Sequence, residues 1–472
     1  MKRRATMVKG EDKTGLKPPV RLGEPLELVI DNLTHSGEGV GRYQGFTVFV
    51  PCALPGERVL AEVISLKPTY CRALLKQVVA AAGCRANPSC PAYADCGACQ
   101  LQHLDYPTQL QQKRQWVVDA LQRIGKLGDV QVHPTLPMAE PWRYRNKAQF
   151  PVSLSKGRIV AGAFRQRTHQ VIDVEDCIIQ HPLNSRILQQ VKQLAEQYRQ
   201  TPYDEGTGQG LLRHVLVRVG FHTEEALAVL VTTAEPFAGK EELAAELMQR
   251  VPELVGVVQN INRRRSNVVL GDEMVLLAGR DYLMDELGGL KFRISPGSFW
   301  QVNPLQTEVL YATALQYAGL TGQETVIDAY CGIGSISLYL ARHARQVIGV
   351  EVVAAAVTDA RRNAQLNGIN NARFFTGEAE QVIPWLYQAN GVKADVIVVD
   401  PPRAGCDQRL LETIAAMEPQ RVVYVSCNPS TLARDLAYLS RNGFAVREVQ
   451  PVDMFPHTTH VECVTLMSRV EK

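Results

Sequence analysis

From residue 305 onward, the chain alternates short apolar runs with longer segments of helical periodicity, and this alternation most constrains its fold. Short runs rich in Val and Ile are typical of buried parallel strands. The expected strands are 325–330, 346–351, 372–376, 394–399, 421–426, 444–450 and 460–467. Helices are expected between the early strands, as at 352–366 and 408–417, which predicts a doubly wound α/β domain at 296–472. The last two strands have no helix between them, so one of them is expected to run antiparallel.

Two reactive side chains follow buried strands of this domain. Asp400 opens the run Asp-Pro-Pro-Arg after the strand at 394–399, and Cys427 lies in Ser-Cys-Asn-Pro after the strand at 421–426. Because ligands of open α/β sheets bind outside the carboxyl ends of the strands, the carboxylate and the thiol are expected at the same edge. A free cysteine is most often a small buried hydrophobe. The Asn-Pro turn and the matching Asp-Pro-Pro run favour instead a nucleophilic thiolate.

The turn after the first strand carries Gly332 and Gly334, which would let a ligand approach the backbone closely. Ser337 occupies the position where a dinucleotide-binding fingerprint needs its third glycine, so the pattern favours a ligand without a pyrophosphate. Glu351 ends the second strand, where an acidic residue accepts hydrogen bonds from ribose hydroxyls. The glycine turn, this acid and Asp400 together indicate S-adenosylmethionine (SAM).

The first part of the chain predicts a basic tail followed by a small β-barrel. Residues 1–19 are polar, rich in Lys and Arg, and end in a Pro-Pro pair, so they are expected to be disordered. Strand patterns separated by turns follow at 26–30, 46–50 and 59–64, with a glycine-rich stretch between the first two. Residues 20–79 are therefore expected to form an OB-like barrel. Such barrels often bind RNA, but the fold alone does not establish that function.

The central region, 80–295, mixes strand and helix patterns and is expected to form an α+β domain. Its stretch 141–172 contains no Asp or Glu, and aromatic residues are interleaved with the basic ones. The basic residues are Arg143, Arg145, Lys147, Lys156, Arg158, Arg165 and Arg167. Because basic side chains neutralise phosphates and aromatic rings stack on bases, the stretch fits a nucleic-acid-binding surface. A solvated basic face explains the composition equally well.

Three cysteines of the central region, Cys90, Cys96 and Cys99, are close together in the sequence. The N-terminus lacks the apolar segment of a secretory signal, so the eleven cysteines of the chain point to metal binding or catalysis rather than to disulfides. A fourth ligand is needed, and Cys177 is the best remote candidate. Three clustered cysteines and a distant one suit an iron–sulfur cluster better than structural zinc. Cys84 competes with Cys90 for the first position.

Glu462 opens the last apolar strand, in the run Phe-Pro-His-Thr-Thr-His-Val-Glu. A carboxylate there is costly unless it has a partner. Burial would raise its pKa, as a general base requires. The alternative is an exposed residue on an edge strand. That alternative is weaker because this strand is expected beside the strand that precedes Cys427.

These motifs together resemble the RNA uracil-5-methyltransferases, most closely the RumA-type enzymes that act on 23S rRNA, over nearly the whole chain. The resemblance implies a TRAM RNA-binding barrel at 20–79. It implies a central iron–sulfur and RNA-binding domain at 80–295, and a Rossmann-like, SAM-dependent methyltransferase domain at 296–472.

The same resemblance implies roles for individual residues. The implied ligands of a [4Fe-4S] cluster are Cys90, Cys96, Cys99 and Cys177. The implied contacts of cofactor or substrate are Gln301, Tyr330, Glu351 and Asp400. Cys427 matches the nucleophile of the family and Glu462 matches its base. Ser335 stands where the rRNA-modifying prototype has Asn, so no contact is assigned to it.

The chemistry of uracil explains why such a site pairs a thiolate with a base. Addition of the Cys427 thiolate to C6 turns the ring into an enolate, whose C5 can attack the sulfonium methyl group. Glu462 would then remove the C5 proton, and Asp400 would accept the N3 hydrogen. The target base would have to leave its stack to reach the thiol. Phosphates would be held by 141–172 and by Arg263-Arg264-Arg265.

The expected substrate is a uridine of 23S rRNA, because the chain has the TRAM-like barrel and the full cysteine set. Uracil-54 of tRNA is the alternative, and the cluster is expected to be structural or RNA-contacting. A radical iron–sulfur enzyme is disfavoured because the Cys-x3-Cys-x2-Cys run is absent, and a non-catalytic RNA-binding protein would lose nothing with Cys427. No stretch approaches the roughly 18 apolar residues of a membrane helix, so no membrane contact is expected. The protein is also expected to be cytoplasmic and monomeric.

Overall fold

The computed structural model describes residues 18–234 and 238–470. The basic tail expected at 1–19 lies outside these residues except for its last two positions. The chain divides into two compact units: the first ends at Ser89 and also includes Gln100–Gln109, and the second contains Cys90–Cys99 and everything from Leu110 on. The cysteine-rich stretch 90–99 therefore belongs to the same unit as the C-terminal domain.

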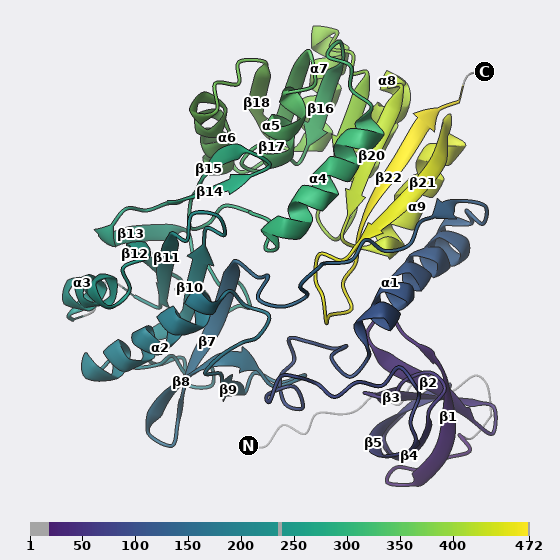
Figure 1. Ribbon diagram of the computed structural model, residues 1–472, viewed down its shortest axis with the longest axis vertical. Helices are drawn as coiled ribbons and strands as arrows, with labels where there is room; N and C mark the ends of the chain where they lie inside the picture. The colour runs from purple at the N-terminus through teal and green to yellow at the C-terminus, as the bar shows by residue number, and fades with distance from the viewer. Residues whose placement is uncertain (1–17, 235–237, 471–472) are drawn as a thin grey trace, which may run out of the picture. The chain divides into compact units, whose positions relative to one another are not determined.

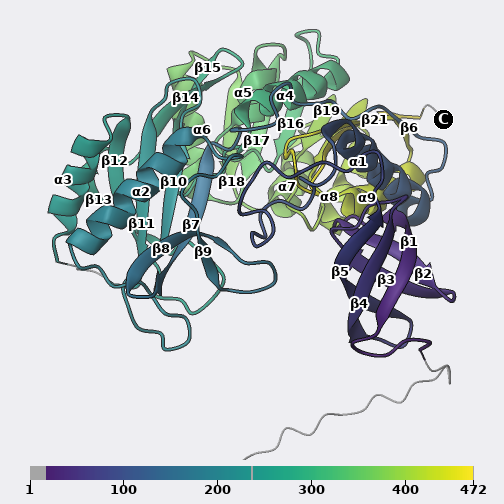
Figure 2. The same ribbon diagram turned by 60° about the horizontal axis from the view of Figure 1, so that its bottom comes forward.

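The first unit is built around a closed barrel of five strands (Figure 2). Its strands are β1 (Pro25–Leu33), β2 (Glu38–Tyr43), β3 (Phe46–Pro51), β4 (Arg58–Leu66) and β5 (Tyr70–Ala80). They join in the order β1-β2-β3-β5-β4, with β3 and β5 parallel. Alternate residues of β1 point into the barrel, where Leu26, Leu28 and Ile30 are buried. This is the pattern of a strand with one face on a core, and it confirms the small β-barrel expected from the sequence.

The glycine-rich stretch between the first two expected strands is itself the strand β2. A Cβ atom on Gly39 would lie 2.6 Å from the carbonyl oxygen of Ala53, and one on Gly41 would lie 2.3 Å from that of Val29. Both positions require glycine because the neighbouring backbone approaches too closely for any side chain. The glycines therefore permit the barrel to close.

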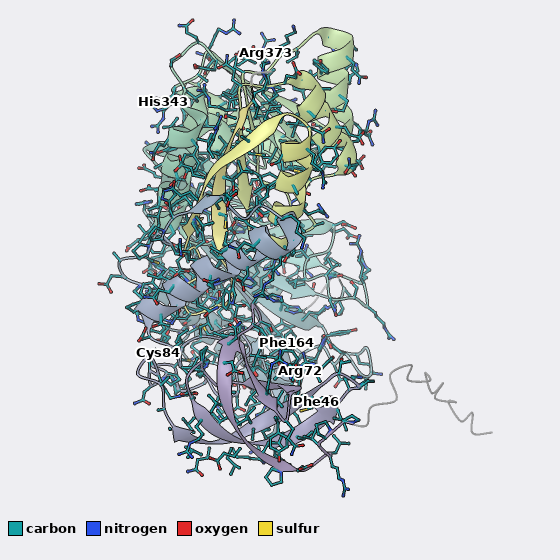
Figure 3. The ribbon with its side chains drawn as sticks, turned by 90° about the vertical axis from the view of Figure 1, so that its right-hand side faces the viewer. Phe46, Arg72, Cys84, Phe164, His343 and Arg373 are labelled. Atoms are coloured by element: carbon teal, nitrogen blue, oxygen red, sulfur yellow. The ribbon has the colours of Figure 1, made fainter. Side chains whose placement is uncertain are left out.

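Arg72 on β5 joins aromatic and acidic side chains of the barrel. Its Nε atom lies 3.1 Å from Oε1 of Glu38, and its guanidinium carbon lies 5.6 Å from the ring centre of Phe49 and 5.7 Å from that of Tyr70. Figure 3 labels Arg72 and Phe46 on the barrel. Aromatic rings beside a guanidinium form the kind of surface on which nucleic-acid bases stack.

The second unit contains a seven-stranded sheet in the order β13-β12-β11-β10-β7-β8-β9. Its elements are β7 (Lys147–Ser155), β8 (Arg158–Phe164), β9 (Val171–Asp173), α2 (Pro182–Gln197), β10 (Leu212–Val219), β11 (Ala226–Thr232), α3 (Lys240–Arg250), β12 (Leu254–Ile261) and β13 (Glu273–Gly279). The helices α2 and α3 pack on one face of this sheet (Figure 2). They bury a core that includes Phe150, Val215 and Leu247. The opposite face of β7 and β10 is left uncovered by these two helices.

An eight-stranded sheet forms the C-terminal part of the second unit, in the order β18-β17-β16-β19-β20-β22-β21-β6. Its strands are β6 (Gln131–Val132), β16 (Thr325–Ala329), β17 (Gln346–Glu351), β18 (Ala372–Thr376), β19 (Val396–Val399), β20 (Arg421–Ser426), β21 (Phe444–Val452) and β22 (Glu462–Arg469). Neighbouring strands are parallel, except that β22 is antiparallel to both β20 and β21. The doubly wound sheet with an antiparallel strand near its end is therefore confirmed.

Helices cover both faces of this sheet (Figure 1). They are α1 (Tyr106–Ala120), α4 (Pro304–Ala318), α5 (Ser335–Ala341), α6 (Ala354–Leu366), α7 (Ala379–Asn390), α8 (Gln408–Met417) and α9 (Pro429–Arg441). Val326 and Val423 pack with α4, α5 and α6, whereas Ile327 and Val422 pack with α1, α7, α8 and α9. Burial on both faces explains why the strands are almost continuously apolar.

Short elements from distant parts of the chain complete this unit. A π-helical turn at Leu121–Gly125 extends α1, and β6 adds a strand beside β21. The hairpin of β14 (Leu283–Leu287) and β15 (Leu290–Ile294) contributes to the core under α4, α5 and α6. A two-residue strand such as β6 has no periodicity by which it could be expected. None of the helices in 18–234 and 238–470 is long and apolar enough to cross a membrane.

Candidate active site

Cys427 and Glu462 lie at matching ends of two antiparallel strands. β20 ends at Ser426, and β22 begins at Glu462. The register pairs Ser426 with Cys463, so the residue after Ser426 comes opposite the residue before Cys463. Directly opposed residues of such a pair have Cα atoms about 4.5–5.5 Å apart. The charge of Glu462 accordingly acts on the Cys427 thiol.

Asp400 reaches the same place from the neighbouring parallel strand. β19 ends at Val399, which pairs with Tyr424 of β20. Asp400 is close enough to Cys427 and to Glu462 to raise the pKa of both. The nucleophile, the base and the carboxylate expected from the sequence therefore come together at the carboxyl edge of the sheet, where ligands bind in this class of fold.

Burial dominates the ionisation of these three groups. Glu462 is 4% exposed, and burial together with the charge of Asp400 raises the pKa of its carboxyl well above the usual range. Burial alone raises the pKa of Asp400 to about 6. Burial, with the charges of Glu462 and Asp400, raises the pKa of Cys427 to about 11. At neutral pH, the thiol of the free protein is protonated and Asp400 is mostly ionised.

Arg403 brings positive charge to this edge. The pKa values of Cys427 and Glu462 are raised overall, but the positive charge of the Arg403 guanidinium offsets part of the rise that burial causes in both. Its Nη2 atom lies 3.4 Å from Nε2 of His460. Burial, assisted by Arg403, lowers the pKa of His460 to about 4, so this imidazole is neutral at neutral pH. Arg403 therefore favours the thiolate form of Cys427.

The start of α9 holds the loop that carries Arg403. The side-chain amide of Asn428 donates a 3.0 Å hydrogen bond to the Arg403 carbonyl, and the hydroxyl of Thr431 donates another at 3.3 Å. Asn428 also caps α9 by accepting a hydrogen bond from the backbone N–H of Ser430. The Asn-Pro pair after Cys427 is thus a helix start with Pro in the first turn. It fixes the positions of the thiol and of Arg403 together.

Hydrogen bonds join the glycine turn after β16 to the acid at the end of β17. The N–H of Gly332 donates to Oε2 of Glu351 at 3.0 Å, and the N–H of Val353 donates to Oε1 at 2.9 Å. Gly332 and Gly334 have φ angles of 56° and 83°, which favour glycine. Glu351 is thereby held beside the turn at which a ligand can approach the backbone.

Tyr330 lies between this turn and the Asp400 loop. It directly follows β16 and has a φ angle of 69°, which is rare for a residue with an aromatic side chain. Its side chain is partly buried, and burial raises the pKa of the phenol, with a contribution from the nearby Cys406 thiol. Tyr330 therefore lies at the carboxyl edge of the sheet, where a contact with cofactor or substrate would have to form.

Gln301 lies at the junction between the central sheet and α4. Its side chain is 8% exposed, and its carbonyl accepts a 3.0 Å hydrogen bond from the side chain of Asn146. The preceding segment is fastened to α6, because the hydroxyl of Ser298 donates to Asp359 at 3.1 Å. These contacts fix the backbone around Gln301.

Two buried groups beside the site are absent from the residues expected from the sequence. The hydroxyl of Tyr311 on α4 lies 2.7 Å from that of Ser335, and Asp400 is among the charges that raise the Tyr311 pKa after burial. Asp328 on β16 accepts a hydrogen bond from Ser337, and burial raises its pKa to about 8. The sequence could have identified Asp328, since a carboxyl inside an apolar strand is costly to bury without a partner or a function. It could not have identified Tyr311, because that residue lies in an ordinary apolar helix.

The four cysteines of the expected metal set converge in the second unit. Cys90, Cys96 and Cys177 line one pocket, and Cys99 packs with Cys177 in a small buried cluster. Burial raises the pKa of Cys96 and of Cys177, and the neighbouring thiols add to the effect. Cys84 belongs to the first unit. Within the described residues, no group of three or more His, Cys, Asp or Glu is arranged as a metal site.

Ion pairs neutralise part of the basic stretch 141–172 and of the arginine run that follows it in the sequence. These pairs are Arg143–Asp176, Arg165–Asp95, Arg263–Glu273 and Arg264–Asp272. Their carboxylates come from other parts of the chain, so a count of basic residues within 141–172 overstates the free positive charge. The cations without an acidic partner are the better candidates for contact with an anion.

A doubly wound sheet with a glycine turn beside Glu351 and with Asp400 at its carboxyl edge has the ligand-binding edge that a SAM-dependent methyltransferase needs. Comparison with known families agrees. The tRNA (Uracil-5-)-methyltransferase family model matches residues 105–470, and the TRAM domain model matches residues 19–76. The chain belongs to the tRNA (uracil-5-)-methyltransferase family and is a SAM-dependent RNA methyltransferase with an N-terminal TRAM domain.

Individual relatives support this assignment. A protein of Halalkalibacterium halodurans described as an uncharacterized RNA methyltransferase is 50% identical over 449 residues, covering 95% of this chain and 98% of its own. Another, of Bacillus cereus, is 51% identical over 459 residues, covering 97% of this chain and 100% of its own. The crystal structure of Pyrococcus abyssi tRNA (uracil-54, C5)-methyltransferase with S-adenosyl-L-homocysteine has a TM-score of 0.74 and 27% identity, covering 93% of this chain and 99% of that one.

Proposed function

We propose that this protein methylates C5 of a specific uridine in 23S rRNA, with SAM as methyl donor, through a covalent bond between Cys427 and C6 of the uracil. The observation that carries the proposal is the meeting of Cys427, Glu462 and Asp400 at one edge of the sheet. Substitution at C5 of uracil needs a nucleophile, a base and a group that recognises the ring, and this edge offers all three.

The steps follow from the weak nucleophilicity of C5 in the intact ring. The Cys427 thiolate forms a bond to C6, and the electrons of the C5–C6 double bond move to O4 as an enolate. C5 then takes the methyl group that SAM supplies, the C4 carbonyl re-forms, and S-adenosylhomocysteine is released as the bond from its sulfur to the methyl carbon breaks. Glu462 removes the proton from C5, the double bond re-forms, and the bond from sulfur to C6 breaks. Because burial raises the pKa of Glu462, it is a stronger base than an exposed carboxylate.

Asp400 selects the base in this scheme. Uracil carries a hydrogen on N3, whereas N3 of cytosine is an acceptor. A carboxylate with a pKa of about 6 is mostly ionised at neutral pH, so it accepts the uracil hydrogen and repels the cytosine lone pair. A site built to hydrogen-bond one group discriminates strongly against an analogue that lacks it. The target base must leave its stack to reach these groups.

The substrate RNA has two candidates. The TRAM barrel and the four-cysteine set support 23S rRNA, because the motifs of the sequence resemble those of the RumA-type enzymes that act on 23S rRNA. The similarity to the tRNA (uracil-54, C5)-methyltransferase of Pyrococcus abyssi over 93% of the chain favours a tRNA as the second candidate. Both candidates use the same chemistry at Cys427, so the two differ only in the RNA surface that is recognised.

We also propose that Cys90, Cys96, Cys99 and Cys177 hold a [4Fe-4S] cluster. The donor set supports this, because iron–sulfur clusters are held by four cysteine thiolates and all four thiols converge in the second unit. The cluster would fasten the stretch 90–99, which already contacts the end of β8 through a 3.2 Å hydrogen bond from Gly97 to Phe164. Its role would then be structural.

Nucleoside mass spectrometry for 5-methyluridine tests the proposal. The protein and SAM are incubated separately with unmodified transcripts of 23S rRNA and of tRNA. The Cys427→Ala variant should form no product. Cys52→Ala, which removes a thiol from the first unit, should retain activity.

Product on rRNA alone would support the proposal as stated. Product on tRNA alone would keep the mechanism and replace the substrate. Product on neither RNA, from protein with its iron content verified, would contradict both. Full activity of the Cys427→Ala variant would contradict the mechanism while leaving the enzyme class intact.

A further inference from the structure

Strand β7 presents two different faces. Ala148, Phe150 and Val152 belong to the core under α2 and α3. Side chains of successive strand residues point to opposite sides, so Lys147 and Gln149 face away from these helices. Farther along this face, Leu216 of β10 is buried in the core shared with the C-terminal part of the unit. At β7, however, Gln149 is exposed and Lys147 is half-buried, so both side chains are available to a ligand.

Strand β10 continues this polar face beside β7. The register places Arg218 directly opposite Lys147 and Leu216 opposite Gln149. Arg145, two residues before Lys147, lies outside β7 and is bridged to Gln180. Three cations are thus gathered on neighbouring positions. The charges of Arg218 and Arg145 both lower the pKa of Lys147.

Two pockets meet at Lys147. One is the pocket of about 580 Å³ that Cys90, Cys96 and Cys177 also line, and another part of its wall is formed by Arg145, Lys147 and Gln149. The other has a volume of about 350 Å³ and is lined by Lys147, Gln149 and Arg218. The cysteine side of the larger pocket would hold the proposed cluster, which leaves the side at Arg145, Lys147 and Gln149 for another ligand. Lys147 and Gln149 line both pockets, so the pockets adjoin at these two side chains and are together called the hollow.

The hollow is lined by residues close in the chain to two expected site residues, Glu462 and Gln301. The larger pocket is lined by Thr458 and His460, which precede the base Glu462 by a few residues. The smaller pocket is lined by Ser298 and Phe299, and Phe299 is 64% exposed. An RNA strand whose uridine enters the active site would therefore pass over this hollow.

The three cations lack the counter-charge that neutralises their neighbours in the sequence. In the described part of the chain, Arg145, Lys147 and Arg218 form no ion pair, and the Lys147 ammonium has no hydrogen-bond partner. Asp176 is the acidic residue among those lining the larger pocket, and it is paired with Arg143 at 2.6 Å. The smaller pocket has no acidic residue in its lining.

Burial and hydrogen bonds hold the side chain of Arg218 in a fixed position. It is 4% exposed, and its Nε atom donates a 3.0 Å hydrogen bond to the carbonyl of Pro296, while a second donor bonds the carbonyl of Ser298. Burial lowers its pKa to about 10, so it stays charged at neutral pH. A buried cation without a carboxylate is costly unless an anion compensates it.

We propose that Lys147, flanked by Arg145 and Arg218, is a phosphate-binding site that holds the backbone of the substrate RNA next to the uridine being methylated. The proposal rests on the proposed function, which supplies the RNA. Lys147 presents a compact charge to one phosphate, and Arg145 and Arg218 complete a positive field on both sides of it. Burial and the two arginines lower the pKa of Lys147 to about 8, so the site is charged at neutral pH.

The test is the salt dependence of RNA affinity. Dissociation constants of transcripts of 23S rRNA and tRNA are measured at several salt concentrations for Lys147→Met, Lys147→Arg and wild type. Loss of one phosphate contact should lower the slope of log affinity against log salt by about 0.7, as for single strands. Lys147→Arg keeps the charge and should keep the slope. Lys156→Met, an exposed lysine of the same basic stretch, should also keep it.

The outcomes separate this proposal from its premise. Lys147→Met removes repulsion from two arginines, so it should unfold at an unchanged or higher temperature, and its affinity for SAM should stay unchanged. An unchanged salt slope in Lys147→Met, or the same loss in Lys156→Met, would overturn the phosphate site while wild-type methylation stands. A fall in SAM affinity with RNA affinity intact would assign the cations to the cofactor instead. Failure of the wild type to bind either RNA would overturn the proposed function itself.

Discussion

The backbone N–H of Cys406 donates a 2.8 Å hydrogen bond to the carboxylate of Asp435, which ties the loop after β19 to the helix after β20. The same buried carboxylate accepts hydrogen bonds at 2.7 Å from the hydroxyl of Tyr424 and from Nε of Arg434. Three donors from three elements thus converge on one group. Such a satisfied buried network rigidifies its surroundings. We infer that Asp435 fixes the loop from which Arg403 reaches the reacting thiol.

Replacing Asp435 with Asn should impair catalysis more than cofactor binding. The amide keeps the size of the side chain but loses the charge that faces Arg434, and one of its atoms becomes a donor. Stability should fall by about 1–3 kcal/mol. A small displacement of catalytic groups should lower kcat by about 10- to 100-fold. Single-turnover methylation, thermal unfolding and SAM binding would be measured together.

A control substitution on the same loop distinguishes a specific effect of Asp435 on the position of the catalytic groups from a general loss of stability. Asp407 is exposed and caps α8 by accepting a hydrogen bond from the N–H of Arg409. Asp407→Asn retains a capping side chain, so both stability and kcat should stay near the wild-type values. If Asp435→Asn lost stability but turned over at the wild-type rate, the positioning role would be wrong.

Replacing Glu462 with Gln should trap the covalent intermediate. The amide cannot take the C5 proton, so methyl transfer proceeds and elimination of the thiolate does not. A denaturation-resistant complex of protein and RNA should accumulate and be visible on a denaturing gel. No such complex should form when Cys427→Ala is added to the same chain. Complete turnover by Glu462→Gln would show that another group removes the proton.

The sequence predicted the C-terminal sheet well because its central strands, β16, β17, β19 and β20, are buried on both faces. Val396–Val399 and Arg421–Ser426 read as apolar runs for that reason, and Asp400 and Cys427 could be placed at one edge by the topology of open sheets alone. Glu462 could be placed near them only because β22 was expected beside the strand before Cys427. Local patterns therefore located the reactive groups.

What the sequence could not show are relations between residues far apart in the chain. Asp435 lies within an amphipathic helix, where nothing marks it as the acceptor for Cys406. The pairing of Arg143 with Asp176, or its absence at Lys147, depends on which strands and loops become neighbours. The basic stretch 141–172 therefore looked uniform in the sequence, whereas the structure divides it into paired and unpaired cations.

Activity should rise with pH because Asp400, Cys427 and Glu462 all act in their deprotonated forms, and two of them have pKa values that set where the rises fall. Asp400 has a pKa of about 6, so kcat/KM should fall as pH falls through that value and the acceptor for uracil N3 is lost. The thiol has a pKa of about 11, so a further rise should continue into alkaline solution. Arg403→Gln removes a charge that lowers the thiol pKa and should shift this second rise to higher pH. Arg409→Gln, an exposed arginine on α8, should leave the profile unchanged.

Protein purified without oxygen should contain iron and inorganic sulfide if the four converging thiols hold a cluster. Cys177→Ser should lose both, because the stretch 90–99 supplies the other ligands and leaves an incomplete set. Cys84→Ser should keep both, because Cys84 belongs to the other unit. Metal analysis and visible absorption would distinguish them. Equal iron in both variants would show that the cysteine assignment is wrong.

A buried ion pair supports the segment before Glu462. Nζ of Lys113 on α1 lies 2.5 Å from Oδ1 of Asp453 and donates a 2.9 Å hydrogen bond to the carbonyl of Phe455, and both charged side chains are fully buried. Lys113→Met would leave the Asp453 carboxylate buried without its cation. Removing one partner of such a pair typically costs about 3–5 kcal/mol.

Adding Asp453→Asn to Lys113→Met should restore much of the lost stability, because two neutral side chains of similar volume replace the pair without a buried charge. Chemical denaturation of the single and double variants measures this. Methylation by the double variant then shows whether the pair also positions the segment that ends at Glu462, since in both variants the carbonyl of Phe455 loses the lysine donor and keeps only its hydrogen bonds from Thr458. If the double variant were no more stable than Lys113→Met, the buried charge would not be the cause of the loss.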